Sequence, residues 1–370
     1  MFLPIANTPR DYAWGADGAI SALLGAEASG RTEAELWLGT HPGSPSRIVG
    51  SEGTLLEAVG GLPFLLKVLA AGSPLSLQAH PTMAQAQAGF AREEAAGIPV
   101  DAPHRNYRDA FHKPELIYAL SERFEALSGF RPAAETRASL ERLLERRGPS
   151  APIQAWIDRL SGDDAIRDTF AWLITRGEGV DELVSALVEL ADDATAAMTT
   201  VRELAVAYPG DPGIAISLML HRVTLERGQA LYLRAGNIHA YLSGVGIELM
   251  ASSDNVLRGG LTPKHVDVPE LLEVLDFRPV PVPYLEPARP QPGVAVFAPD
   301  VPDFELVVIE GDAVVPLTGP AIALCVQGSF ALAGEREAAE LARGDATYVS
   351  ADEAELAVRG SGLLFVATTG

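Results

Sequence analysis

Hydrophobic residues in the first 130 positions occur in short runs that glycine, proline and polar residues separate. The clearest runs cover residues 36–39, 64–69 and 116–120. Runs of this length between turn-forming residues are typical of β-strands, because a strand needs only a few residues while a stable helix is longer. We therefore predict a β-rich domain over residues 1–130.

A different periodicity governs residues 131–207. Hydrophobic residues there recur at spacings of three and four, which places them on one face of a helix. These residues are Leu140, Leu143, Leu144, Ile166, Phe170, Leu173, Ile174, Val180, Leu183, Val184, Leu187 and Val188. Glycine and proline interrupt the pattern, so it predicts several short helices. We expect residues 131–207 to form a helical insertion domain.

Strand-like runs return after the helical segment. Those at 230–233 and 246–250 predict that residues 208–280 complete the first β domain. Prolines cluster between residues 279 and 292 and mark a linker. Short hydrophobic runs then follow at 304–309, 321–326, 346–349, 356–358 and 363–366. Regularly spaced short strands are typical of jelly-roll barrels, so we predict a second barrel over residues 281–370.

Composition excludes two classes of partner. The formal net charge is −21, whereas a nucleic-acid interface needs a basic face. No segment has the roughly 18 consecutive apolar residues of a membrane span. The single cysteine, Cys325, rules out an internal disulfide, and we expect it to be buried as a small hydrophobic residue. We expect a cytoplasmic monomer that acts on a small molecule.

Lysine is rare in this chain. Of the 28 Lys and Arg residues, only Lys67, Lys113 and Lys264 are lysines. A lysine ammonium binds phosphate as a point charge and acts as an acid or base when its pKa is shifted, whereas arginine stays charged. All three lysines stand beside other polar residues suited to catalysis. We interpret them as parts of one active site, with surface lysines as the alternative.

Gln78 and His80 lie two residues apart in the segment SLQAHP at 76–81. In a strand, both side chains would project from the same face. Imidazole nitrogens are common zinc ligands, and an amide oxygen can serve as a weaker one. The pair is therefore a candidate metal site, although a buried, hydrogen-bonded histidine would give the same pattern.

A second polar segment, HKPE, places His112, Lys113 and Glu115 directly before a hydrophobic run. Pro114 cannot donate a hydrogen bond to a neighbouring strand, so this turn is expected at the edge or rim of a sheet. Such a rim is a common place for functional groups. A solvated, charged turn is the alternative interpretation.

A third segment runs from Gly228 to Tyr241. The spacing of Gly228, Gly236 and His239 fits the second cupin signature, in which a strand and a tight turn precede a metal-facing histidine. Arg234 stands where that signature has proline, so the match is partial. Further along, Glu248, Arg258 and Lys264 add a carboxylate and two cations.

These segments, taken in order, resemble the motifs of the type I phosphomannose isomerases. The matching motifs are YAWG at 12–15, AELWLGTH at 34–41, QAHP at 78–81, HKPE at 112–115, HAYL at 239–242, SDNVLR at 253–258 and LTPK at 261–264. They cover roughly residues 1–130 and 210–280. The resemblance implies a mainly β chain with two jelly-roll domains of the cupin type and a helical domain.

The resemblance also implies one zinc ion per chain, held by Gln78, His80, Glu115 and His239. Such a donor set leaves zinc a Lewis acid with a position open for water or a substrate oxygen. No histidine follows His265, so a second cupin domain would lack a metal.

The implied reaction interconverts mannose 6-phosphate and fructose 6-phosphate through a cis-enediol. Arg258 would be the catalytic arginine that stabilises negative charge on the reacting oxygens. The proton-transfer base is open between Lys113 and Glu248. His112 or Asp254 would help to open the sugar ring.

The phosphorylated sugar would be held by Ser76, Lys67 and Lys264, which the resemblance assigns to the phosphate. We place Tyr241, in the HAYL segment, among the substrate contacts as well.

Two other functions are compatible with parts of this pattern. Two histidines and a glutamate also bind iron in non-haem oxygenases, but Gln78 and the lysines argue against that function. A sugar-phosphate-binding protein without catalytic activity is the second alternative.

Overall fold

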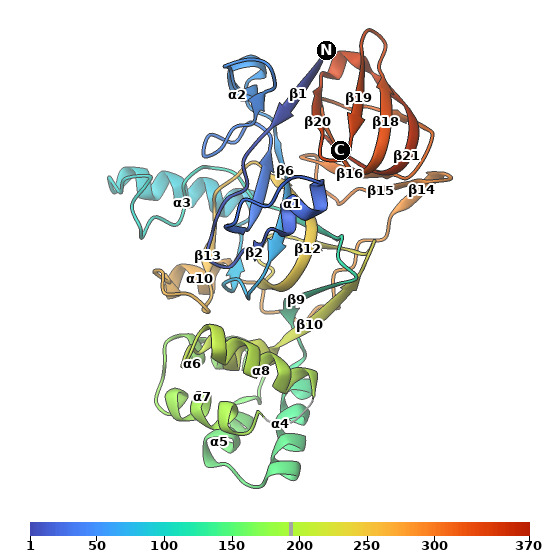
Figure 1. The fold of residues 1–370 in the computed structure, drawn as a ribbon. Helices are drawn as coiled ribbons and strands as arrows, with labels where there is room; N and C mark the ends of the chain where they lie inside the picture. The colour runs from blue at the N-terminus through green and yellow to red at the C-terminus, as the bar shows by residue number, and fades with distance from the viewer. Residues whose placement is uncertain (192–194) are drawn as a thin grey trace.

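The computed structural model describes residues 1–191 and 195–370 (Figure 1). Strands form most of the regular structure. A lobe of helices lies between strands β9 (Arg123–Phe130) and β10 (Leu220–Glu226). The prediction of a mainly β chain with a helical insertion is therefore confirmed, while the limits of the individual domains stay a prediction.

The first β region is organised around the long strand β12 (His239–Ala251). Its other strands are β4 (Glu35–Leu38), β6 (Phe64–Ala71), β7 (Gln78–Ala79), β8 (Glu115–Ala119), β9, β10, β11 (Ala230–Leu233) and β13 (Leu257–Arg258). The first part of β12 pairs with β7 and β9, and residues 244–251 pair with β6. Gly244 lies where the partner changes. Its φ is +123°, and a Cβ there would lie 2.8 Å from Phe124 Cδ2.

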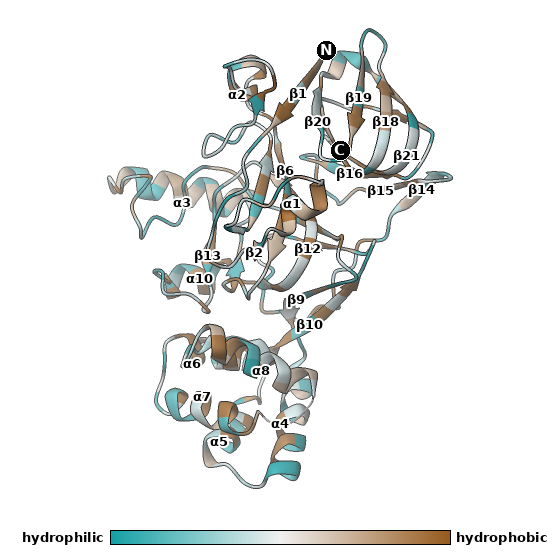
Figure 2. Ribbon diagram, in the orientation of Figure 1, coloured by the Kyte–Doolittle hydropathy of each residue, from teal (hydrophilic) through white to brown (hydrophobic). Residues whose placement is uncertain are grey.

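The helical lobe is built from short amphipathic helices. They are α4 (Ala133–Arg147), α5 (Ala151–Arg159), α6 (Ala165–Ile174), α7 (Val180–Glu189), α8 (Ala196–Ala207), α9 (Gly213–Ile216) and the 3₁₀-helix η1 (Ser217–Met219). The predicted inward positions Leu140, Phe170 and Leu183 are buried in one core with Trp156. Figure 2 shows that these helices carry both hydrophobic and hydrophilic residues, as amphipathic helices do.

The C-terminal β region contains β14 (Ala288–Gln291), β15 (Val294–Phe297), β16 (Glu305–Ile309), β17 (Ala313–Pro316), β18 (Ala321–Ala333), β19 (Ala338–Ala342), β20 (Ala346–Val349) and β21 (Glu355–Thr368). The sequence predicts two separate strands at 356–358 and 363–366, but the structure has one continuous strand, β21. Gly360 and Gly362 interrupt the hydrophobic pattern without ending the strand, because both face β18 across a continuous ladder.

Strand β1 (Phe2–Ala6) differs from the prediction, which places residues 1–130 in the first β domain. β1 pairs with β20 of the C-terminal sheet, and its other edge pairs with β5 (Arg47–Ile48). Phe2 and Ile5 are buried there. The physical reason is that β1 satisfies its backbone groups on a distant strand, a pairing that local hydrophobicity does not encode.

The remaining elements are β2 (Ala16–Asp17), β3 (Thr32–Glu33), α1 (Ala19–Leu24), α2 (Leu55–Val59), α3 (Met83–Ala95), α10 (Val268–Val274) and the 3₁₀-helix η2 (Ala351–Glu353). Sequence analysis missed α3, although Thr82 and Gln85 form a capping box at its start. Its alanine- and glutamine-rich sequence has a weak hydrophobic stripe. No helix within residues 1–191 and 195–370 is long and apolar enough to cross a membrane.

Candidate functional site

Three side chains from distant parts of the chain converge in the first β region. One ligand atom from each of His80, Glu115 and His239 lies within 4.8 Å of the other two, and all three residues are buried. Glu115 begins β8 and His239 begins β12, while His80 directly follows β7. β12 pairs with β7 at His239, opposite Gln78, and with β8 at Met250, opposite Glu115, so both ends of this long strand carry neighbours that contribute to the site.

Both imidazoles direct Nε2 at the carboxylate. His80 Nε2 lies 3.2 Å from Glu115 Oε1, and His239 Nε2 lies 3.2 Å from Glu115 Oε2. The other ring nitrogens meet backbone carbonyls, His80 Nδ1 at 2.8 Å from Asn255 O and His239 Nδ1 at 3.0 Å from Asn237 O. Because a carbonyl only accepts, each Nδ1 is the donor in these bonds, which leaves each Nε2 directed at the carboxylate.

This arrangement fits a divalent cation. Lone pairs and carboxylate oxygens that face one another repel unless a proton or a metal ion lies between them. Gln78 adds a fourth donor, with its amide nitrogen 3.2 Å from His239 Nε2, and rotation of the amide presents its oxygen instead. Two imidazoles, a carboxylate and an amide are a donor set that suits zinc.

Electrostatics keep Glu115 and His80 in the forms that bind a metal. Burial raises the pKa of Glu115, but His80 and Lys113 oppose it, so the net pKa lies well below the usual range of a glutamate. Lys113 Nζ lies 2.9 Å from Glu115 Oε1. Burial lowers the pKa of His80, and Lys113 adds to that effect, although Glu115 opposes it. The carboxylate is thus ionised and His80 is neutral near pH 7.

A cavity of about 520 Å³ opens beside the convergent ligands. Seven predicted catalytic or substrate-binding residues line it, namely Ser76, Lys67, Lys113, Tyr241, Glu248, Arg258 and Lys264. Gln78 and Glu115 line it too. An adjoining cavity of about 270 Å³ shares Lys67, Lys113, Arg258 and Lys264 and adds Asp254. Most of the predicted site residues therefore lie around one continuous space.

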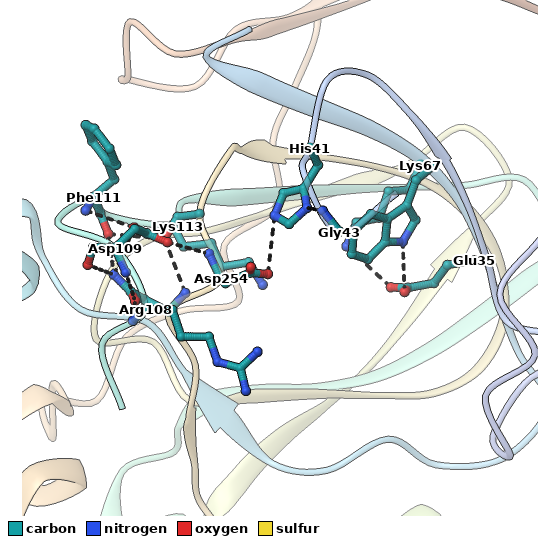
Figure 3. Close-up of polar contacts among 12 residues, drawn as sticks. Glu35, His41, Gly43, Lys67, Arg108, Asp109, Phe111, Lys113 and Asp254 are labelled. Carbon is teal, nitrogen blue, oxygen red and sulfur yellow. Dashed lines mark hydrogen bonds and ion pairs between the residues drawn. The ribbon is translucent and has the colours of Figure 1, made fainter. Parts of the chain in front are cut away.

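Lys67 has two carboxylate partners. Its Nζ lies 3.3 Å from Glu35 Oε1 (Figure 3). It also lies 2.9 Å from Glu248 Oε2, and the centroid of the Trp37 ring is 5.1 Å away. The strands β4, β6 and β12 are neighbours, and their register places Trp37, Lys67 and Glu248 side by side. Burial lowers the pKa of Lys67, but the two carboxylates raise it by more. Its charge is therefore already neutralised within the protein.

Tyr241 is buried next to this cluster. Its hydroxyl has no hydrogen-bond partner in the described part of the chain. Burial, followed by Glu248, raises the pKa of Tyr241 well above its usual value. The hydroxyl therefore stays protonated and is available to a bound molecule.

His112 does not line either cavity. Its Nε2 lies 2.9 Å from Asp303 Oδ2, in the loop before β16. Asp254, by contrast, lines the smaller cavity, and its Oδ1 lies 3.3 Å from His41 Nε2 (Figure 3). Burial raises the pKa of Asp254, but His41 lowers it by more, so this carboxylate is ionised.

Sequence analysis assigned no role to several residues that line these cavities. They are Tyr12, Trp14, Glu35, Trp37, His41, Arg105, Asn106, Arg108 and Tyr208. The first five belong to the motifs at 12–15 and 34–41, whose resemblance to the family carried no function for the individual residues. Tyr208 lies at the end of α8, where its hydroxyl donates to the Pro74 carbonyl at 2.7 Å, and no local pattern marks it.

Comparisons with known proteins agree with this geometry. Residues 2–133 match the family model for the catalytic domain of type I phosphomannose isomerase. The chain is 36% identical over 386 residues to the mannose-6-phosphate isomerase of Escherichia coli (strain K12), with 97% of each chain covered. It is 32% identical over 407 residues to the Homo sapiens mannose-6-phosphate isomerase, covering 95% of this chain and 93% of that one.

A solved structure of the Salmonella typhimurium mannose 6-phosphate isomerase, bound to its substrate fructose 6-phosphate and to zinc, is also similar. It has a TM-score of 0.89 and 33% identity to this chain, covering 100% of this chain and 99% of the solved one.

Proposed function

The chain belongs to the type I mannose-6-phosphate isomerases, and we propose from this membership that it interconverts mannose 6-phosphate and fructose 6-phosphate with one bound zinc ion. The observation that supports this most strongly is the convergence of two imidazoles and a carboxylate beside a cavity that Arg258 and Lys264 line. The two β regions are, in this proposal, jelly-roll barrels of the cupin type. A cytoplasmic location and a monomeric state stay predictions.

Gln78, His80, Glu115 and His239 are proposed to hold the zinc. Bound zinc supplies a Lewis acid that polarises the substrate oxygens. The amide makes a fourth protein donor, which distinguishes this site from the two-histidine, one-carboxylate site of an iron oxygenase. The proton positions at Nδ1 of both histidines fix the ring orientation before any ligand binds.

Arg258 is proposed to stabilise the negative charge that builds on O1 and O2 as the enediol forms. Its guanidinium lines both cavities and forms no ion pair with any residue that the structure describes. A positive charge that is held in place before the reaction, and is not neutralised by a protein carboxylate, lowers the activation barrier most effectively.

Glu248 is proposed as the base that moves the proton between C1 and C2. Burial raises its pKa above the usual value of a glutamate, although Lys67 opposes this effect. A raised pKa makes a carboxylate a stronger base, and its ionised form accepts a proton without any other group having to lose one first. Lys113, the other candidate, forms an ion pair with the Glu115 carboxylate at 2.9 Å and is therefore engaged with a proposed zinc ligand.

Ring opening is assigned to Asp254 rather than His112, because Asp254 lines the cavity and His112 is bonded to Asp303 outside it. Lys264 and Ser76 are proposed to bind the phosphate, and the free Tyr241 hydroxyl is proposed to donate to a sugar oxygen. Lys67 is not assigned to the phosphate, because its charge is matched by Glu35 and Glu248. Its role is to hold Glu248 in place.

A coupled assay tests the proposal. The purified chain is incubated with mannose 6-phosphate, and fructose 6-phosphate is measured before chelation, after chelation and after zinc is added back. We expect activity that chelation abolishes and zinc restores. Binding of the sugar phosphate without turnover, in a zinc-loaded protein, would contradict the enzyme assignment and favour a binding protein.

A further inference from the structure

Within the described residues, three cationic side chains around the smaller cavity have no carboxylate partner. Arg108, Arg258 and Lys264 all line it, and none of them forms an ion pair with a residue that the structure describes. Burial lowers the pKa of Arg258, and the Arg108 charge lowers it further. Burial also lowers the pKa of Lys264, and the charges of Arg258 and then Arg108 add to that effect. The three charges are thus close enough to repel one another.

This cluster is unusual for so acidic a chain. Asp and Glu outnumber Lys and Arg by 49 to 28, so carboxylates are abundant, and many of the described arginines do pair with one. Asp254 also lines this cavity, but its carboxylate is bonded to His41 and forms no ion pair with Arg108, Arg258 or Lys264. Cations held together without a counterion bind an anion readily, because the anion removes their mutual repulsion.

The backbone at Arg108 is held by a buried amide. Asn255 Oδ1 accepts from the Arg108 N–H at 2.8 Å, and Asn255 Nδ2 donates to the carbonyls of Asp109 and Phe111, each at 2.8 Å. The Arg108 side chain extends away from these contacts (Figure 3). Asn255 is fully buried, and its own carbonyl meets His80 Nδ1. One residue therefore fixes both a proposed zinc ligand and the backbone of Arg108.

We propose that Arg108 binds the phosphate of the substrate together with Lys264, and that it selects phosphorylated over unphosphorylated mannose. This inference rests on the proposed isomerase function. It gives Arg108 the phosphate contact that the sequence suggested for Lys67. A guanidinium can donate two parallel hydrogen bonds to phosphate oxygens, so its contribution is directional as well as electrostatic.

Steady-state kinetics on the zinc-loaded enzyme test the role of Arg108. We expect Arg108→Ala to raise KM for mannose 6-phosphate about 10-fold or more, as loss of one charge-assisted contact predicts, with kcat within about twofold. The KM of Arg108→Lys should lie between those of the wild type and Arg108→Ala. Arg227→Ala is the matched control, because Arg227 is also an exposed arginine without an ion pair in the described residues but lies around a different cavity. An unchanged KM in Arg108→Ala would overturn the proposal.

Binding of inorganic phosphate provides a second measurement that does not depend on turnover. Calorimetric titration should show weaker binding to Arg108→Ala than to the wild type, while Arg227→Ala binds as the wild type does. Equal phosphate affinity in all three proteins would refute the assignment. If the wild type binds phosphate through Arg108 but does not isomerise mannose 6-phosphate, the enzyme function fails and the anion site stands.

Discussion

Lys67 lies in the core of the first β region with only 5% of its surface exposed, between the carboxylates of Glu35 and Glu248. Removing one member of a buried ionic cluster leaves the others without compensation. We expect Lys67→Met to lower the free energy of unfolding by about 3–5 kcal/mol, measured by urea denaturation. Lys264→Met is the control, because Lys264 is exposed. It should leave stability near that of the wild type and raise KM instead.

Substitution of Arg258 is expected to affect the reaction rate, whereas substitution of Lys67 affects stability. Because its proposed role lies in the transition state, Arg258→Ala should lower kcat by about 100-fold or more, with a smaller change in KM. Steady-state rates with mannose 6-phosphate measure both constants. A variant with unchanged kcat and a raised KM would show that Arg258 only binds the ground state.

Cys325 is fully buried in the C-terminal sheet, as expected from the sequence. Burial and then Asp345 raise the pKa of its thiol to about 11. The reactive thiolate is therefore scarce at pH 8, and we expect the folded protein to resist alkylation while the urea-unfolded protein reacts rapidly. Because the folded pKa is raised, this thiol also favours unfolding as the pH rises from about 9 to about 11. Fast labelling of the native protein at pH 8 would contradict its burial.

At the scale of elements, the helical lobe contributes to the site through the short connection between α8 and α9. Asp211 Oδ1 accepts from the Gly213 N–H at 2.7 Å and from the Leu261 N–H at 3.0 Å. Leu261 is fully buried with a φ of +53°, a conformation that costs energy for a branched side chain. Its loop joins Arg258 to Lys264, so Asp211 holds the loop that carries both cations.

We therefore expect Asp211→Ala to raise KM for mannose 6-phosphate and to lower the free energy of unfolding by about 1–3 kcal/mol. Asp211→Asn keeps the oxygen acceptor, so we expect a smaller rise in KM and a smaller loss of unfolding free energy. Kinetics and urea denaturation on the two variants show whether the hydrogen bonds that Asp211 accepts, or its negative charge, hold the loop. Equal losses in both would indicate that the negative charge, and not the hydrogen bonds, matters.

The local pattern of hydrophobic residues was sufficient to predict elements whose conformation depends mainly on their own residues. The strands Ala230–Leu233 and Ala346–Val349 have the predicted limits, and the helices of the lobe follow the predicted period. Pairing between distant strands was not predictable, because the partner of β1 lies more than 340 residues away. Helix α3 was missed because its hydrophobic stripe is weak and the prediction relied on hydrophobic periodicity. The capping box of Thr82 and Gln85 was the stronger signal for this helix.

At the scale of the whole molecule, the predicted metal ligands do converge, although they span residues 78–239 of the chain. Short motifs marked each ligand, but only folding brings β7, β8 and β12 together. The same motifs could not show that Lys67 is neutralised, that His112 contacts Asp303 or that the Arg108 guanidinium forms no ion pair with a described residue, because each depends on neighbours from other elements.

Metal binding should therefore stabilise the fold. A cation that binds the folded chain and not the unfolded one raises the melting temperature with its free concentration. We expect chelation to lower Tm and added zinc to restore it in a concentration-dependent way, measured by scanning calorimetry. His80→Ala, which removes one donor, should show no such dependence. A Tm that zinc does not change would argue against a metal at these residues.

The pairing of β1 with β20 has a consequence for synthesis. The residues of β1 leave the ribosome long before Val349 exists, so the backbone edge that pairs with β20 has no partner while nearly the whole chain is being made, although β5 becomes available early for the other edge. The beginning of the protein is thus among the last parts to find its place. A chain cut short before β20 would leave Phe2 and Ile5 exposed to solvent and to other chains.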